Sequence, residues 1–76
     1  MEETYTFEEV VALLKESDSR VSFTFKIGTY SDVEITKHRE WGYLIVAWGN
    51  ESYFQKLSTF SGKRLERIKE ATYRKN

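Results

Sequence analysis

Residues 42–49 read GYLIVAWG, in which two glycines enclose the only uninterrupted apolar run of the chain. The run is too short for an independent helix, and it is rich in β-branched and aromatic side chains, which is typical of a strand buried on both faces. We therefore expect residues 42–49 to form the inner strand of a small sheet that organises the rest of the chain.

The two faces of this strand pose the main functional question. Because side chains alternate along a strand, one face carries Leu44, Val46 and Trp48, and we expect these three to join the core. Tyr43 and Ile45 then point to the other face, which is polar on the neighbouring strands. This apolar stripe needs a cover, which is either the C-terminal helix of the chain or a partner molecule.

The segment before this strand predicts a helix and a hairpin. Thr6 and Glu9 have capping-box spacing and are followed by an apolar stripe, and residues 17–19 are turn formers that end the helix. Residues 20–27 alternate between apolar and polar side chains, as in a half-buried strand. A turn over 28–32 precedes a second strand that begins near Val33, and a charged connection over 37–41 leads to the third strand.

The segment after this strand has two interpretations over residues 52–58. Ser52 and Gln55 have capping-box spacing and the apolar residues recur at helical intervals, whereas a fourth strand would follow a turn at 49–50. We favour a short helix because the segment lacks β-branched residues. A final helix is predicted from Lys63 to Tyr73. The chain is thus expected to be one α+β domain over 1–76, with an N-terminal helix, a three-stranded antiparallel sheet and one or two C-terminal helices packed on the sheet (αβββαα).

Composition restricts the chemistry. The chain has no cysteine and a single histidine, which rules out disulfides and argues against a structural zinc. Asp32, Glu34, Thr36 and His38 share one strand face, but a strand rise of ~3.3 Å per residue separates Glu34 from His38 by ~13 Å, too far for one metal ion. We expect no catalytic residue, no metal and no small-molecule cofactor. No apolar run approaches the ~20 residues of a membrane span, so we expect a cytoplasmic protein.

Charge is neutral overall but unevenly placed, with a balance of −5 over residues 1–18 and +5 over residues 56–76. The basic end predicts a nucleic-acid-binding patch on the last helix, with Tyr73 available to stack on a base. Its residues are Lys63, Arg64, Arg67 and Arg74. The interspersed Glu66 and Glu70 and the near-neutral isoelectric point equally fit an ordinary solvated helix.

The predicted order of elements resembles that of some small phage-encoded anti-CRISPR inhibitors of Cas9. The likeness covers the whole chain as architecture and has no residue motif, so it assigns no functional residue. It implies a small inhibitor of a host or defence protein. Those inhibitors act through an acidic surface that mimics DNA, whereas the last predicted helix of this chain is basic.

Our leading functional hypothesis is a non-enzymatic protein-interaction module. It would bind a protein partner, or a second copy of itself, through the third strand and the adjacent helix, with Tyr43, Ile45 and Tyr53 as anchors. Nucleic-acid binding through the basic C-terminal helix and the phage-type inhibitor remain the alternatives.

Overall fold

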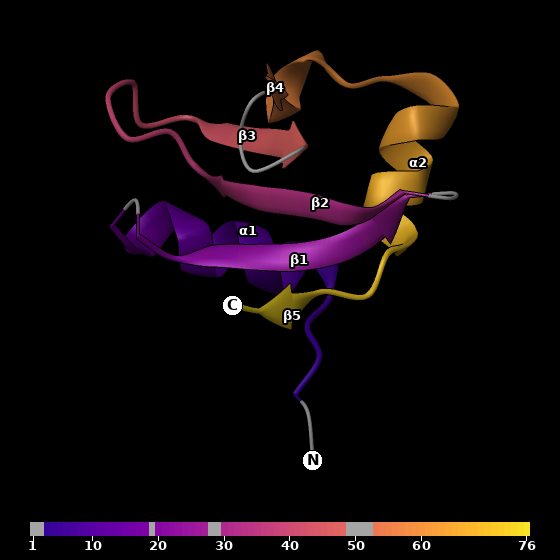
Figure 1. Cartoon of the computed structure of the whole chain (residues 1–76), viewed down its shortest axis with the longest axis horizontal. Helices are drawn as coiled ribbons and strands as arrows, with labels where there is room; N and C mark the ends of the chain where they lie inside the picture. The colour runs from indigo at the N-terminus through magenta and orange to yellow at the C-terminus, as the bar shows by residue number, and fades with distance from the viewer. Residues whose placement is uncertain (1–2, 19, 28–29, 49–52) are drawn as a thin grey trace.

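A computed structural model describes residues 3–18, 20–27, 30–48 and 53–76, of which residues 30–32 are described in their backbone only. Helix α1 is followed by a hairpin, a third and a fourth strand, a 3₁₀ turn, helix α2 and a short last strand (Figure 1). The bounds are α1 Phe7–Glu16, β1 Ser22–Ile27, β2 Tyr30–Lys37, β3 Leu44–Trp48, β4 Tyr53–Lys56, η1 Leu57–Thr59, α2 Gly62–Glu70 and β5 Arg74–Lys75.

In the described residues, the sheet has five strands in the order β4-β3-β2-β1-β5, and every neighbouring pair is antiparallel. The α+β class holds for the described residues, but the prediction of a three-stranded sheet is wrong. The three predicted strands form the centre of the sheet, and the two additional strands, β4 and β5, form its edges.

The preference for a short helix over residues 52–58 is also wrong, because Tyr53–Lys56 forms β4 and only Leu57–Thr59 coils into a 3₁₀ turn. The helix and strand propensities of individual residues are a weak guide to the structure of so short a segment. Residues Tyr53 to Lys56 pair with residues Trp48 to Ile45 in the ladder, so backbone hydrogen bonding to β3 outweighs local helical preference.

The last helix ends earlier than predicted. Helix α2 stops at Glu70, and its C-cap residue Ala71 has extended backbone with φ −69° and ψ 156°. The chain then turns back along the sheet, where Tyr73 bridges to Tyr5 and Arg74 pairs with Thr24. The open edge of β1 offers backbone partners that a helical continuation would leave unused.

The N-terminal prediction is confirmed. The backbone N–H of Glu9 donates to the Thr6 hydroxyl at 3.3 Å, and the Glu9 carboxylate accepts from the Thr6 N–H at 2.9 Å, which completes the capping box. Val10 and Leu14 from α1 are fully buried.

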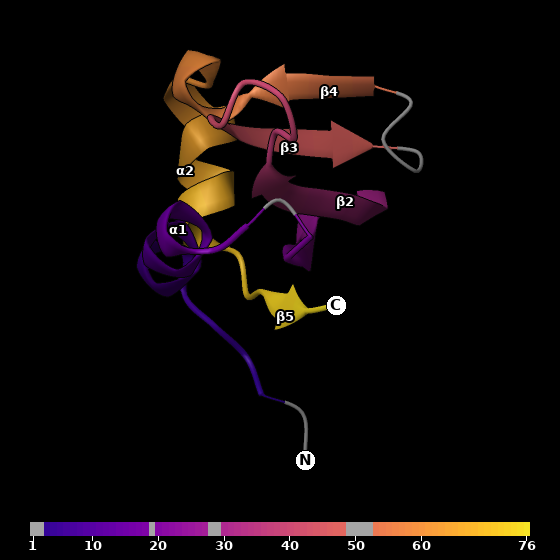
Figure 2. The same ribbon diagram turned by 90° about the vertical axis from the view of Figure 1, so that its left-hand side faces the viewer.

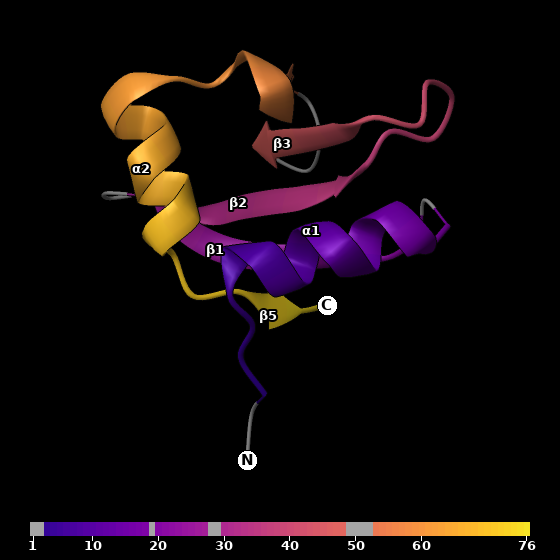
Figure 3. The same cartoon turned by 180° about the vertical axis from the view of Figure 1, so that it is seen from behind.

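Both helices lie on the same side of the sheet (Figure 2). Seen from behind, α1 and α2 lie between the viewer and the sheet (Figure 3). The core fills the space between the helices and this face, which we call the covered face. Its fully buried side chains include Phe23, Ile35 and Val46 from the sheet and Ile68 from α2. We call the opposite side the open face, because no described helix packs on it.

Candidate functional site

Four aromatic rings cluster at one end of the open face, near the turn between β2 and β3. The His38 ring stacks on Trp41 at 4.2 Å between centroids and lies 5.6 Å from Tyr43 and 5.3 Å from Phe54. Trp41 also stacks on Tyr43 at 5.6 Å. We call these four residues the aromatic corner.

Backbone hydrogen bonds hold the turn that carries Trp41. The N–H of His38 donates to the carbonyl of Tyr43 at 2.7 Å, and the N–H of Gly42 donates to the carbonyl of His38 at 3.0 Å. Gly42 has φ +76°, a conformation that favours glycine. Nδ1 of His38 accepts from the backbone N–H groups of Glu40 and Trp41 at 3.1 and 3.2 Å. One side chain therefore positions both the turn and the stacked indole.

The strand register places the rest of the corner. Tyr43 lies just before β3 and Phe54 lies on β4, where it pairs with Ala47. Nζ of Lys56 sits 4.5 Å from the centroid of the Tyr43 ring, so a cation covers one ring of the corner.

The exposed apolar surface of the open face is concentrated at this corner. The exposed fraction is 61 % for Trp41 and 39 % for Phe54, whereas Ile45 and Ala47 beside them are 5 % and 1 % exposed. Ile45 is flanked in the ladder by Thr36 of β2 and Lys56 of β4. Neighbouring strands therefore shield the apolar stripe, and the C-terminal helix does not cover it, because α2 lies on the other side of the sheet.

The corner lies next to an open sheet edge. Within the described residues, β4 pairs with β3 alone. Tyr53, whose side chain lies on the covered face of β4, is 60 % exposed. The opposite edge is different, because β5 is two residues long, both of them cations, and the chain beside it bridges to Tyr5. Short, charged edges resist pairing with other chains, whereas β4 has Lys56 as its single charge.

The structure separates the three predicted interface anchors. Tyr43 belongs to the aromatic corner and Ile45 is buried, so it offers a partner almost no surface. Tyr53 points to the covered face, where its ring lies 5.5 Å from Trp48. The prediction that Leu44, Val46 and Trp48 face the core agrees with the structure, in which Val46 is fully buried and the other two pack partly buried against the core.

Sequence reasoning missed His38, Trp41 and Phe54 as members of the corner. The charged connection predicted over 37–41 contains Trp41, and the short helix predicted over 52–58 contains Phe54. The sequence carried one usable signal for Phe54. If residues 53–56 form a fourth strand, the alternation of side chains places Phe54 on the same face as its ladder partner Ala47, which is the open face.

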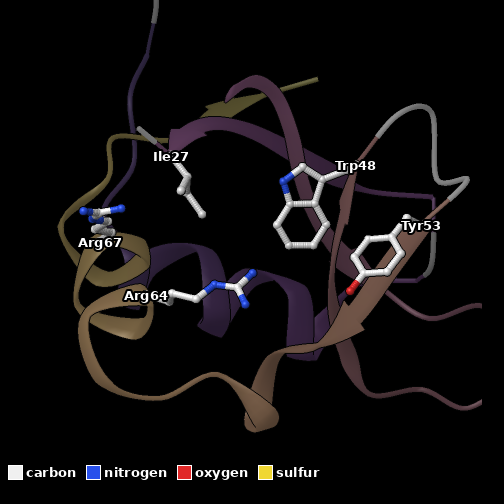
Figure 4. A pocket seen from close by; sticks show the side chains of 5 residues that line it. All are labelled: Ile27, Trp48, Tyr53, Arg64 and Arg67. Atoms are coloured by element: carbon white, nitrogen blue, oxygen red, sulfur yellow. The ribbon is translucent and has the colours of Figure 1, made fainter. Parts of the chain in front are cut away.

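A second feature lies on the covered side, at the end of the sheet nearest α2. It is a groove of about 550 Å³ with both aromatic and cationic walls (Figure 4). Its described lining residues are Ile27, Trp48, Tyr53, Arg64 and Arg67. We call it the arginine groove.

The four predicted basic residues are not brought together. Arg64 and Arg67 line the arginine groove, and Lys63 is exposed on the same helix outside it. Arg74 is not on a helix, because it lies in β5 at the far edge of the sheet from β4. Tyr73 is fully buried and cannot stack on a base. The prediction of one continuous basic helix surface is therefore wrong.

Thr36 and His38, two of the four residues in the strand row considered for catalysis, have structural roles. The Thr36 hydroxyl donates to the carbonyl of Val21 at 2.7 Å, and His38 supports its turn. No group of three or more potential metal ligands occurs among the described residues. Likewise, no helix in the described part of the chain is long and apolar enough to cross a membrane.

The fold and these sites define an α+β domain with one helix-covered and one open sheet face. Comparisons with protein-family models, with curated proteins and with solved structures gave no significant match. The five-stranded sheet also departs from the three-stranded order on which the resemblance to anti-CRISPR inhibitors was based. That resemblance therefore supports no inhibitor function.

Proposed function

We propose that the chain is a non-enzymatic, cytoplasmic protein-interaction module that binds a second copy of itself through strand β4 and the aromatic corner. The supporting observation is the open edge of β4, which exposes a ring on each face of the sheet beside the 61 % exposed Trp41. Large aromatic side chains are the residues that most often dominate interface energies.

An edge strand presents unpaired N–H and C=O groups, which another strand can satisfy. In a solution of this chain, the strand that is always present is β4 of another molecule. Antiparallel pairing about a two-fold axis normal to the sheet would join the two sheets with both open faces on the same side.

The side chains of β4 suit this pairing. Residues of equal parity face each other, so Phe54 would meet either Phe54 or Lys56 of the second copy. The first arrangement pairs two rings across the interface, and the second places a cation against a ring. Both use surface that is exposed in the single chain.

The test is sedimentation velocity at about 10 μM and about 1 mM, which brackets weak to moderate dimer affinities. We expect a concentration-dependent dimer for the natural sequence. Phe54→Lys adds a charge to the edge and should remain monomeric at both concentrations, with an unchanged far-ultraviolet circular dichroism spectrum.

Leu13→Lys is the matched control. Leu13 is 44 % exposed on α1, close to the 39 % of Phe54, but it lies on a helix and not on the β4 edge. Its substitution should leave the dimer intact. A natural chain that stays monomeric at about 1 mM, or equal weakening by both substitutions, would overturn the proposal.

A further inference from the structure

The arginine groove is separate from the aromatic corner, because it opens on the covered side of the sheet. We propose that it binds single-stranded nucleic acid, with a base stacked on Trp48 and Tyr53 and the adjacent phosphate held by Arg64 and Arg67. This inference does not depend on self-association.

The two arginines leave their donors available. The guanidinium of Arg64 lies 5.1 Å from the centroid of the Phe60 ring and extends into the groove toward Trp48 and Tyr53 (Figure 4). The guanidinium groups of Arg64 and Arg67 make no hydrogen bond or ion pair with the described part of the chain. A guanidinium has five N–H donors in a planar fork that matches phosphate oxygens.

The aromatic wall is held in place from behind. Trp48 stacks on Phe60 with centroids 6.2 Å apart and planes inclined by 28°, and its ring lies 5.5 Å from that of Tyr53. Tyr53 is 60 % exposed, so its ring already faces solvent and needs no rearrangement to receive a base. Stacking of a base on such a ring adds affinity and tolerates any base sequence.

The combination of aromatic rings and guanidinium groups in the groove favours a nucleic acid over an acidic peptide. An acidic peptide would satisfy the guanidinium groups but would leave the planar rings without a stacking partner. A nucleotide supplies a planar base and a phosphate a short distance apart, and a groove of about 550 Å³ that is open to solvent accepts a strand that continues beyond it. The described lining has two cations and no carboxylate, so it favours an anionic chain.

The experiment measures binding of a fluorescein-labelled oligothymidylate of about 10 nucleotides, within the site sizes of single-strand-binding proteins, by fluorescence anisotropy. Two phosphate contacts predict that a tenfold rise in salt weakens binding about 25-fold. Arg64→Gln and Arg67→Gln should each weaken binding and reduce the logarithmic salt slope by about 0.7.

Lys63→Gln is the matched control, because it removes the same charge from the same helix outside the groove. Its effect should be much smaller than that of Arg64→Gln. A Trp41→Phe background leaves Trp48 as the one tryptophan, and its emission should be quenched when a base stacks on it.

Three results of the oligonucleotide measurements would overturn the inference. They are undetectable binding at about 20 mM salt, equal weakening by Lys63→Gln and Arg64→Gln, and Trp48 emission that does not change on binding. A polyglutamate peptide that binds as tightly as the oligonucleotide would also overturn it, because carboxylates alone would then suffice. Phe54→Lys, which tests self-association, should leave oligonucleotide binding in place.

Discussion

Tyr73 has a different role in the structure from the one that the sequence predicts. Near the end of a predicted basic helix it was available to stack on a base, but in the structure it is fully buried. Its ring lies 4.6 Å from that of Phe25, and its hydroxyl donates to the carbonyl of Ile68 at 2.5 Å. Burial raises the pKa of Tyr73 above its ordinary value of 10.0, and the charge of Glu8 adds to the rise.

Tyr73→Phe should reduce the free energy of unfolding by about 1 kcal/mol at pH 8, because the Ile68 carbonyl loses the phenol donor and keeps the longer bond from the Ala71 N–H at 3.4 Å. The raised pKa makes this difference depend on pH. Below pH 10 both folded and unfolded chains keep the phenol proton, but above pH 10 the unfolded chain ionises first, which costs the natural protein about 1.4 kcal/mol of stability per pH unit. The difference in the free energy of unfolding between the natural protein and Tyr73→Phe should therefore vanish near pH 11.

Urea unfolding of the two proteins between pH 8 and pH 11 measures this difference. Because both proteins share every other titrating group, the comparison isolates Tyr73. A difference that stays constant up to pH 11 would show that the phenol ionises as readily in the folded as in the unfolded chain.

At the scale of elements, the turn between β2 and β3 depends on a side chain as well as on backbone geometry. Nδ1 of His38 accepts two backbone N–H groups, and the same ring stacks on Trp41. The turn is therefore a small unit that holds the indole at the aromatic corner.

His38→Ala should destabilise the protein by about 1 kcal/mol, because both N–H groups lose their acceptor. His38→Asn is the paired variant, since its side-chain oxygen can accept in the same position without restoring the ring. We expect His38→Asn to recover part of the stability, and both variants to lose the near-ultraviolet circular dichroism of the stacked indole. Equal destabilisation by both would argue that the stacked ring, and not the acceptor, stabilises the turn.

At the scale of the whole molecule, β5 gives the sheet its second edge and joins the end of the chain to β1. The N–H of Asn76 donates to the carbonyl of Ser22 at 3.0 Å, and its side chain bonds the hydroxyls of Thr24 and Ser22 at 2.6 and 2.9 Å. Residues 74–76 thus pair with the first three residues of β1, Ser22 to Thr24.

Ending the chain at Tyr73 should reduce the free energy of unfolding by about 2 kcal/mol, because it removes these three hydrogen bonds together with the β1–β5 pairing. It should also add a new association in sedimentation, since β1 becomes an uncovered edge. Asn76→Ala is the control, because it keeps β5 and should cost less. No loss of stability on truncation would show that β5 contributes nothing to the fold.

The sequence alone determined the elements whose pattern is local. The capping box at Thr6 and Glu9, the alternation within residues 20–27 and the apolar run within residues 42–49 each specify their structure through short-range periodicity. The described residues contain the capping box, β1 at Ser22–Ile27 and β3 at Leu44–Trp48. The core-facing set Leu44, Val46 and Trp48 was predictable for the same reason, because alternation leaves only two choices.

Only the tertiary structure decided the edges of the sheet and the sites built on them. Residues 53–56 and 74–75 are strands because β3 and β1 have unpaired backbone groups beside them, and such long-range pairing has no local signal in the sequence. Once β4 is a strand, Phe54 and Tyr53 fall on opposite faces, so the first belongs to the aromatic corner and the second to the arginine groove. Neither the aromatic corner nor the arginine groove could be predicted from residue spacing along the chain. Each site joins residues from separate elements, which come together through sheet pairing and helix packing.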